Sequence, residues 1–143
     1  MAKQHKAIYH FMVEWGGSRA NFIEVSGLEI TTEVIEYREG GDPNQPARKL
    51  PGLTRYKNIL LKRGILKGDN DFFNWMRITT ENQVEHRDII IKLLDKNQKL
   101  VMSWRALNAF PVRLSGPVLN AGANEVAIEE LELTHDGLVI EVK

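Results

Sequence analysis

The chain has 143 residues and a mass of 16.3 kDa, the size of one domain with a single core. Its 43% hydrophobic and 27% charged residues are close to globular averages and exclude collagen-like, low-complexity and intrinsically disordered chains. With 19 Lys and Arg against 19 Asp and Glu, no net positive field favours nucleic acid or anionic lipid, and the lack of cysteine excludes disulfide scaffolds.

Most of the sequence predicts β-strands, because apolar residues recur at every second position and β-branched residues and aromatics are frequent. The first strand places four large residues on one face, which are Tyr9, Phe11, Val13 and Trp15. Further strands are expected at 21–25, 28–37, 57–65, 87–94 and 100–107, with an extended continuation over 108–114. The strand at 28–37 carries polar residues on both faces, so we expect one side of it to meet water or a partner.

Residues 38–56 contain three prolines and three glycines, a density of breakers that predicts a long loop. Loops of this length in compact domains are usually functional or disordered. We therefore expect a single domain over residues 1–143, with an extended loop at about 38–56.

One short helix is expected after residues 68–71, which supply N-cap candidates and acidic side chains suited to a helix N-terminus. Apolar residues follow at helical spacing, and we expect four of them to pack the helix on the β core: Phe72, Phe73, Trp75 and Met76.

The alternation of apolar residues changes parity within 125–134, which predicts a bulge or a crossing between sheets near Glu129 and Glu130. A final hairpin is expected at residues 135–137, where Asp136-Gly137 suits a tight turn, before a last strand at 138–142. Eight or nine strands with one short α-helix predict a mainly β fold, either a β-barrel or two packed antiparallel sheets.

Charges are segregated along the chain although they cancel in total. Residues 43–68 hold seven cations and no acid, whereas 28–42 and 121–143 are mainly acidic. These stretches either form solvated faces that pair within one molecule, or form complementary patches through which copies dock head to tail. Nucleic-acid binding by the basic stretch is disfavoured, because Tyr56 is the only aromatic residue there for stacking.

No motif for catalysis, metal binding or cofactor binding is found. The four histidines lack metal-ligand spacing, and His135-Asp136 has no Gly-x-Ser-x-Gly nucleophile to serve. Glu129 and Glu130 are adjacent on a strand and point to opposite faces. We expect a non-enzymatic protein without cofactor or metal, with no signal peptide and no membrane-spanning segment, since the longest aliphatic stretch is 89–94.

Short motifs over nearly the whole chain resemble, in order, those of contractile-tail phage tube proteins, in particular inner-tube subunits of extracellular contractile injection systems. The motifs are Phe22-Ile23-Glu24-Val25-Ser26-Gly27-Leu28, Val34-Ile35-Glu36-Tyr37-Arg38-Glu39-Gly40, Lys49-Leu50-Pro51-Gly52-Leu53, Leu61-Lys62-Arg63-Gly64, Asn74-Trp75, Arg87-Asp88, Trp104, Asn108-Ala109-Phe110-Pro111, Glu125-Val126-Ala127-Ile128-Glu129 and His135-Asp136-Gly137-Leu138.

This resemblance implies a β-barrel-like subunit related in fold to the tube protein of type VI secretion. Six subunits would form a ring, each giving two hairpins to a continuous barrel around a lumen, and rings would stack inside a contractile sheath. Implied partners are further copies of the chain, sheath, baseplate or spike, tube terminator and protein cargo. Assembly would occur in the bacterial cytoplasm, as part of a phage tail or of a released extracellular particle.

The resemblance also suggests residue roles. The segment 38–56 would bridge subunits or rings, through contacts made by Arg38, Glu39, Arg48, Lys49, Arg55, Glu125 and Glu129. In particular, Arg48 and Lys49 would meet acids such as Glu125 or Glu129 of another copy. Three residues are expected to face the lumen: Thr31, Glu33 and Lys62.

Two alternatives from other classes remain open at this point. One is a monomeric ligand-binding β-barrel of the lipocalin kind, which would need a large apolar interior where Phe72, Phe73 and Trp75 are expected instead. The other is a secreted ring or effector carrier of the type VI kind that works apart from a sheath.

Overall fold

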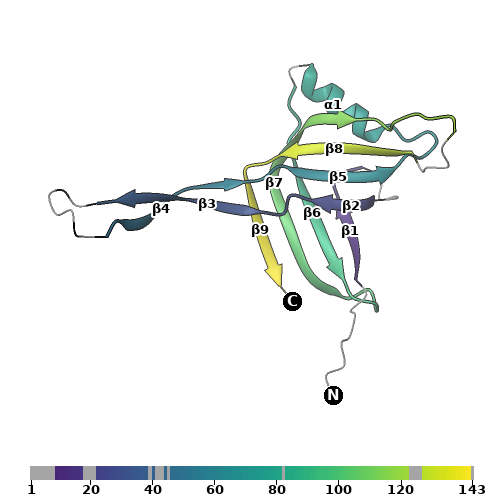
Figure 1. The fold of residues 1–143 in the computed structure, drawn as a ribbon. Coiled ribbons are helices and arrows are strands. Elements are labelled where there is room, and N and C mark those ends of the chain that lie inside the picture. Colours follow the sequence, from purple (N-terminus) through teal and green to yellow (C-terminus); the bar gives the residue numbers. More distant parts are fainter. Residues whose placement is uncertain are drawn as a thin grey trace.

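A computed structural model describes residues 9–17, 22–38, 40, 44, 46–81, 83–122 and 127–142 (Figure 1). Within them lie nine strands and one helix: β1 His10–Glu14, β2 Phe22–Ser26, β3 Ile30–Tyr37, β4 Arg48–Tyr56, β5 Ile59–Gly64, α1 Asp71–Thr80, β6 Arg87–Leu94, β7 Leu100–Ser115, β8 Ile128–Thr134 and β9 Gly137–Val142. The predicted mainly β fold with one short helix is confirmed.

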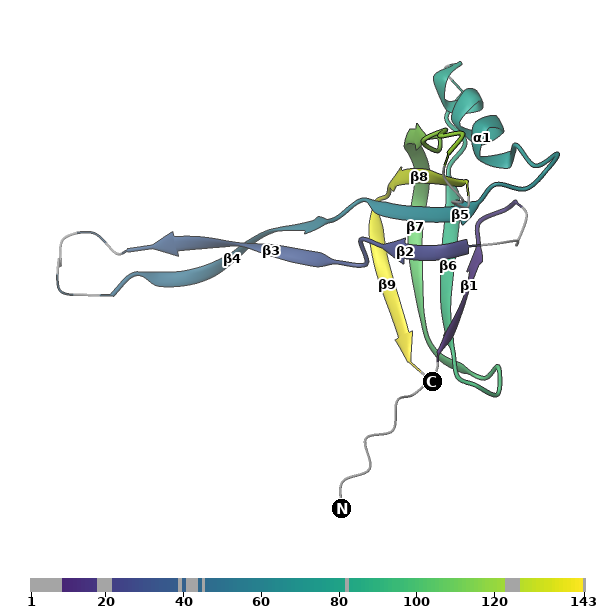
Figure 2. The same cartoon turned by 45° about the vertical axis from the view of Figure 1, so that its right-hand side comes forward.

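Two antiparallel four-stranded layers share the long strand β7. The first half of β7 lies between β6 and β9, and β1 completes that layer in the order β1-β6-β7-β9. The second half of β7 pairs with β8, and the second layer continues as β7-β8-β5-β2. The two layers cross steeply, and their facing apolar sides enclose the core (Figures 1 and 2).

β7 passes from one layer to the other at Asn108, whose φ of 51° is a conformation that asparagine adopts more readily than most residues. The Asn108 backbone N–H donates to the Asp88 carboxylate at 3.0 Å, and its side-chain amide donates to Asp136 at 3.1 Å. The Asp136 backbone N–H in turn donates to the Leu107 carbonyl at 2.8 Å. This corner therefore joins the bend of β7 to the segment between β8 and β9.

Two predictions about the end of the chain are wrong because of this corner. The expected hairpin at 135–137 is wrong, because β8 and β9 pair with different halves of β7 and not with each other. The expected bulge or crossing near Glu129 and Glu130 is also wrong, since β8 pairs with β5 in unbroken register from Ile128 to Leu133. The crossing between layers occurs a few residues later, at 135–136.

Helix α1 covers one end of the core with an aromatic cluster. Phe72 and Trp75, one turn apart, are fully buried beside Trp15, and the Trp75 indole N–H donates to the Glu85 carbonyl at 2.8 Å. Met76 is half-buried. Phe73 does not pack on the core as expected: it is 54% exposed, because the position after Phe72 lies about 100° around the helix.

Arg63 of β5 lies inside this core with 1% of its surface exposed. Its guanidinium contacts Glu129 of β8 at 2.7 Å and Asp69 at 3.1 Å, and it lies 3.9 Å over the Phe72 ring. Asp69 also accepts the backbone N–H of Asp71, the first residue of α1, at 3.1 Å. One buried cation thus joins β5, β8 and the start of the helix.

Strands β3 and β4 form an arm, residues 30–37 and 48–56, that projects far from the two layers (Figures 1 and 2). The arm prolongs the β2–β5 pair in the same register, across a narrow point where a Cβ on Gly27 would lie 2.0 Å from the Asn58 carbonyl oxygen. Gly27 also has a φ of +91°. Glycine suits this position because a side chain would meet the Asn58 carbonyl and because other residues rarely adopt a positive φ.

The arm corrects the prediction of a loop over 38–56, because residues 48–56 form β4. The breakers fit a two-stranded ribbon: Pro51 lies opposite Val34 beside a register shift, where a missing N–H is tolerated. Gly52 lies against Ile35, whose carbons would be 3.0 Å from a Cβ. Residues 48–56 therefore form an extended strand although their composition is typical of a loop.

Substitution of Arg63 by alanine is expected to lower the free energy of unfolding by about 3 to 5 kcal/mol, because it leaves two poorly exposed carboxylates without their cation. Urea unfolding followed by circular dichroism measures this. The control is Arg77→Ala, which breaks only the exposed Arg77–Glu81 pair and should cost less than about 0.5 kcal/mol. Equal losses in both variants would contradict a dominant role for Arg63.

Candidate functional site

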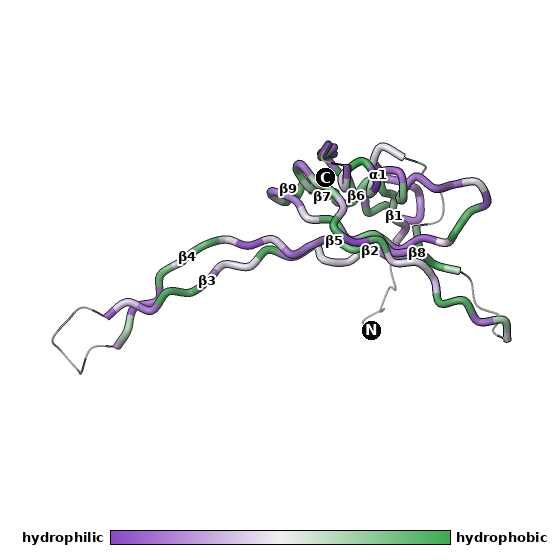
Figure 3. Tube along the Cα trace, turned by 90° about the horizontal axis from the view of Figure 1, so that it is seen from above, coloured by the Kyte–Doolittle hydropathy of each residue, from purple (hydrophilic) through white to green (hydrophobic). Residues whose placement is uncertain are grey.

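The arm exposes nearly all of its side chains. Every residue of β3 is exposed, and so is every residue of β4 except Gly52. Figure 3 shows hydrophobic stretches on both strands of the arm. An isolated two-stranded ribbon is marginally stable in water. The arm is therefore a candidate contact surface that another molecule would complete.

The pairing of β3 with β4 divides the arm into two faces. The face named here the Ile35 face contains three cross-strand pairs: Thr31 with Arg55, Ile35 with Leu50, and Tyr37 with Arg48. The Val34 face contains Val34 with Pro51 and Glu36 with Lys49, together with Ile30 and Thr32 of β3. Both faces expose large apolar side chains, including Ile35 at 52% and Val34 at 64%.

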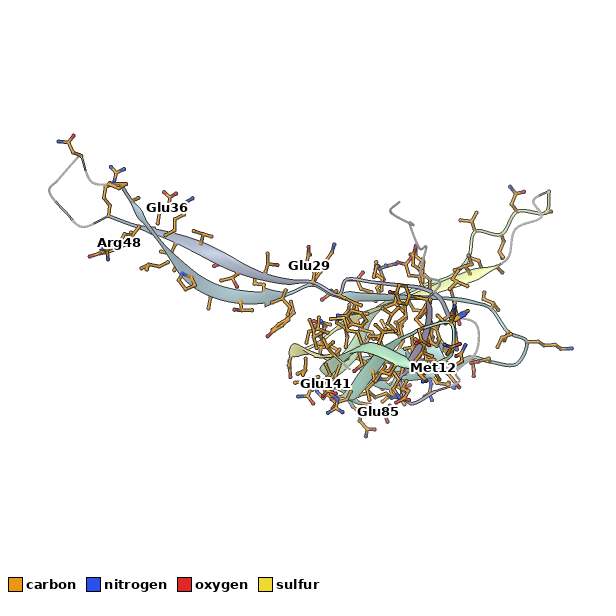
Figure 4. All side chains as sticks on the ribbon, turned by 90° about the horizontal axis from the view of Figure 1, so that it is seen from below. Met12, Glu29, Glu36, Arg48, Glu85 and Glu141 are labelled. Carbon is orange, nitrogen blue, oxygen red and sulfur yellow. The ribbon has the colours of Figure 1, made fainter. Side chains whose placement is uncertain are left out.

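Cations lie toward the distal end of the arm, where Figure 4 shows Arg48 and Glu36. Among the described residues, Arg38, Arg48 and Lys49 make no ion pair, whereas Arg55 contacts Glu33 at 2.6 Å within the arm. Two of the predicted contact residues, Glu39 and Glu125, lie outside the described residues.

Glu129 is misplaced in the predicted set of intermolecular contacts. Its carboxylate is bound to the buried Arg63, and only 17% of its side chain is exposed. The expected pairing of Arg48 or Lys49 with Glu129 of another copy is therefore wrong for this structure, because alternation in β8 turns Glu129 toward the core.

A second candidate surface is the outer face of the β7-β8-β5-β2 layer, opposite the buried Leu61 and Leu131. Charges alternate across it in what we call the charge ladder, formed by Glu24, Lys62, Glu130, Arg113 and Glu132. Lys62 contacts Glu24 at 2.9 Å, and Arg113 contacts Glu130 at 3.2 Å and Glu132 at 3.0 Å.

Hydrogen bonds within the charge ladder favour the ionised forms of Lys62, Arg113 and Glu132. The hydrogen bond to Glu24 raises the pKa of Lys62, and the hydrogen bond to Glu132 raises that of Arg113. The Asn58 amide, which donates to Glu132 at 2.8 Å, lowers the pKa of that carboxyl, with Arg113 as the second cause. These charges compensate one another across four strands.

Of the predicted lumen-facing residues, only Lys62 belongs to the charge ladder. Thr31 and Glu33 lie on the arm, outside the layer that carries the charge ladder. The three residues therefore do not belong to one layer. The other ladder residues are Glu24, Arg113, Glu130 and Glu132. The sequence shows that Glu130 and Glu132 alternate along one strand, but it does not show which strands pair and so bring the four residues together.

A third feature is an open apolar groove of about 310 Å³ between β2 and the inner side of the β1-β6-β7-β9 layer. Its lining was not predicted, because it combines residues from four separate strands and the segment after β2: Phe11, Ile23, Glu24, Val25, Leu28, Ile91, Leu93 and Trp104.

Within the part of the chain that the structure describes, no three His, Cys, Asp or Glu side chains are grouped to hold a metal ion. His86 and His135 instead contact backbone carbonyl oxygens, those of Asn108 at 3.1 Å and Lys57 at 3.0 Å. The same described residues contain no helix with the length and apolar character needed to cross a membrane.

The lowered pKa of Glu132 predicts a pH dependence. A carboxyl whose folded-state pKa is depressed adds stability above its unfolded value, near 4.5, and loses it as pH falls through the folded value. We expect Glu132→Gln to flatten the acid limb of the stability curve below about pH 4.5, measured by urea unfolding at several pH values. The exposed Glu81→Gln is the control; an unchanged acid limb in Glu132→Gln would contradict the effect.

Comparison with known proteins gives consistent matches. The family model described as T4-like virus tail tube protein gp19 matches residues 8–139. No curated protein matches the chain significantly.

Solved structures match over almost the whole chain. A chain in the tube-terminating cap of the anti-feeding prophage is 34% identical, with a TM-score of 0.87, over 100% of this chain and 95% of that one. A chain in the sheath-tube complex of the PVC extracellular contractile injection system is 35% identical, with a TM-score of 0.85, over 95% and 90%. Hcp1 from Flavobacterium johnsoniae shares the fold, at 15% identity and a TM-score of 0.63, over 93% and 95%.

Proposed function

The chain belongs to the T4-like virus tail tube protein gp19 family, and we propose that six copies close into a ring and that rings stack into a hollow tube. It is a structural subunit of a phage tail or an extracellular contractile injection particle, a class of protein that acts by assembly and not by catalysis. A tube subunit is favoured over a monomeric ligand-binding barrel.

The observation that carries the ring is the pair of free edges in the β7-β8-β5-β2 layer. Among described strands, β2 pairs only with β5, and residues 110–115 of β7 pair only with β8. Three successive antiparallel pairings make β2 and this half of β7 antiparallel to each other. The β7 edge of one copy can thus pair with the β2 edge of the next and continue the same pattern, which removes both exposed edges.

Closure of this kind gives the charge ladder its place in the tube. One face of the layer is buried against the core, so the face with Lys62 and Arg113 lines the lumen. A wall of paired charges remains wet and suits the passage of protein cargo. Sheath, baseplate and tube terminator would contact the outer surface and the ends of the tube, after assembly in the bacterial cytoplasm.

The arm would bridge neighbouring rings. It extends the β2–β5 pair along the strand direction, beyond the body of its own subunit (Figure 1). Its distal cations Arg38, Arg48 and Lys49 would meet acidic groups of a copy in the next ring. This gives a head-to-tail contact, which stacks without limit instead of closing.

The ring is tested by light scattering and negative-stain imaging of the purified protein over a range of concentrations. We expect species of about six times 16.3 kDa and rings or tubes with a central hole. A monomer at every concentration, both alone and when expressed together with sheath and baseplate proteins, would contradict the proposal.

Reversal of the distal charges tests the bridge. Arg48→Glu combined with Lys49→Glu is expected to shorten tubes and lower their yield while rings still form, because like charges then face the acidic groups of the next ring. The matched control is Lys96→Glu with Lys99→Glu, the same charge change in the turn between β6 and β7. Unchanged tube length in the arm variant would contradict an electrostatic bridge.

A further inference from the structure

No residue that the structure describes fills the apolar groove between β2 and the β1-β6-β7-β9 layer. We propose that it receives the arm of a second copy, so that the Ile35 face of one subunit seats in the groove of the subunit stacked next to it. This inference rests on the proposed tube and names the site at which the arm docks.

The size of the groove suits the arm. A cavity of about 150 Å³ holds one benzene-sized group, so a volume of about 310 Å³ accepts about two large apolar side chains. Ile35 and Leu50 are directly opposite on the Ile35 face and are 52% and 45% exposed. This cross-strand pair presents two adjacent aliphatic side chains of the required size, and burial of both removes apolar surface from water.

The two surfaces lie on opposite sides of the subunit. In Figures 1 and 2 the arm projects past the β9 edge of the β1-β6-β7-β9 layer, whereas β1 forms the other edge. Phe11 of β1 and Leu93 of the adjoining β6 line the groove. Displacement of a second copy along the direction of the arm therefore brings its β1 side, with the groove, toward the arm of the first copy.

The polarity of the lining agrees with an aliphatic occupant. Of the described residues that line the groove, Glu24 alone is charged, and its carboxylate is paired with Lys62 in the charge ladder. The other lining residues are apolar and match the Ile35 and Leu50 side chains.

Engineered cysteines test the contact cleanly, because the chain contains no cysteine of its own. The test variant combines Ile35→Cys on the arm with Ile23→Cys in the groove, both at positions about half exposed. The assembled protein is oxidised and run on a denaturing, non-reducing gel. A head-to-tail contact joins each copy to the next, so we expect a ladder of trimers and higher species, each step one chain larger.

The matched control combines Val34→Cys with Ile23→Cys and places the thiol on the opposite face of the arm. We expect no ladder beyond dimers from this control or from either single variant. Tubes that form normally but give equal ladders from both faces, or none from the Ile35 variant, would overturn the docking site while leaving the tube intact. Absence of rings and tubes from the unmodified chain would instead contradict the proposed function.

Trp104 gives a second readout that needs no cross-link. It lines the groove and is partly exposed, whereas Trp15 and Trp75 are 1% and 0% exposed. Tryptophan emission should therefore shift to shorter wavelength as rings stack, and the shift should disappear in Trp104→Phe. A shift that persists in Trp104→Phe, or no shift in the unmodified protein while tubes form, would also overturn the proposal.

Discussion

The buried guanidinium of Arg63 is the constraint on which the arrangement of the subunit depends. A cation inside an apolar core must be paired, and Asp69 and Glu129 supply the partners from the start of α1 and from β8. The helix is thereby held over one end of the two layers, with Phe72 against the guanidinium. The inner side of the β7-β8-β5-β2 layer faces this core, and its outer side carries the charge ladder.

A subunit built in this way is incomplete alone. Two strand edges of one layer are unpaired among the described strands, the arm exposes its side chains on both faces, and an apolar groove is open to water. Each of these is a liability for a monomer and would be removed by contact with another copy. Ring closure would pair the free edges, and stacking would cover the arm and the groove. Strand β2 would take part in both contacts, through its free edge and through Ile23 and Val25 in the groove.

Particular residues show how far the sequence could be interpreted. Alternation of apolar residues predicted most strands, and helical spacing predicted α1 with Phe72 and Trp75 on its buried face. The prolines and glycines of 38–56 were misleading, because they lie in a two-stranded ribbon whose register shift and exposed edges tolerate them. Glu129 was expected on the surface, since nothing local indicates that a cation 66 residues away is buried beside it.

The sequence by itself determined the strand content, the single helix, the segregation of charge and, through motifs in a fixed order, the family. Only the tertiary structure decided that β9 pairs with β7 and not with β8, that Glu24, Lys62 and Arg113 share one face, and that an open groove lies between β2 and the β1-β6-β7-β9 layer. The physical reason is that periodicity reports which side chains alternate, whereas strand partners, and hence the buried face, depend on contacts between residues far apart in the chain.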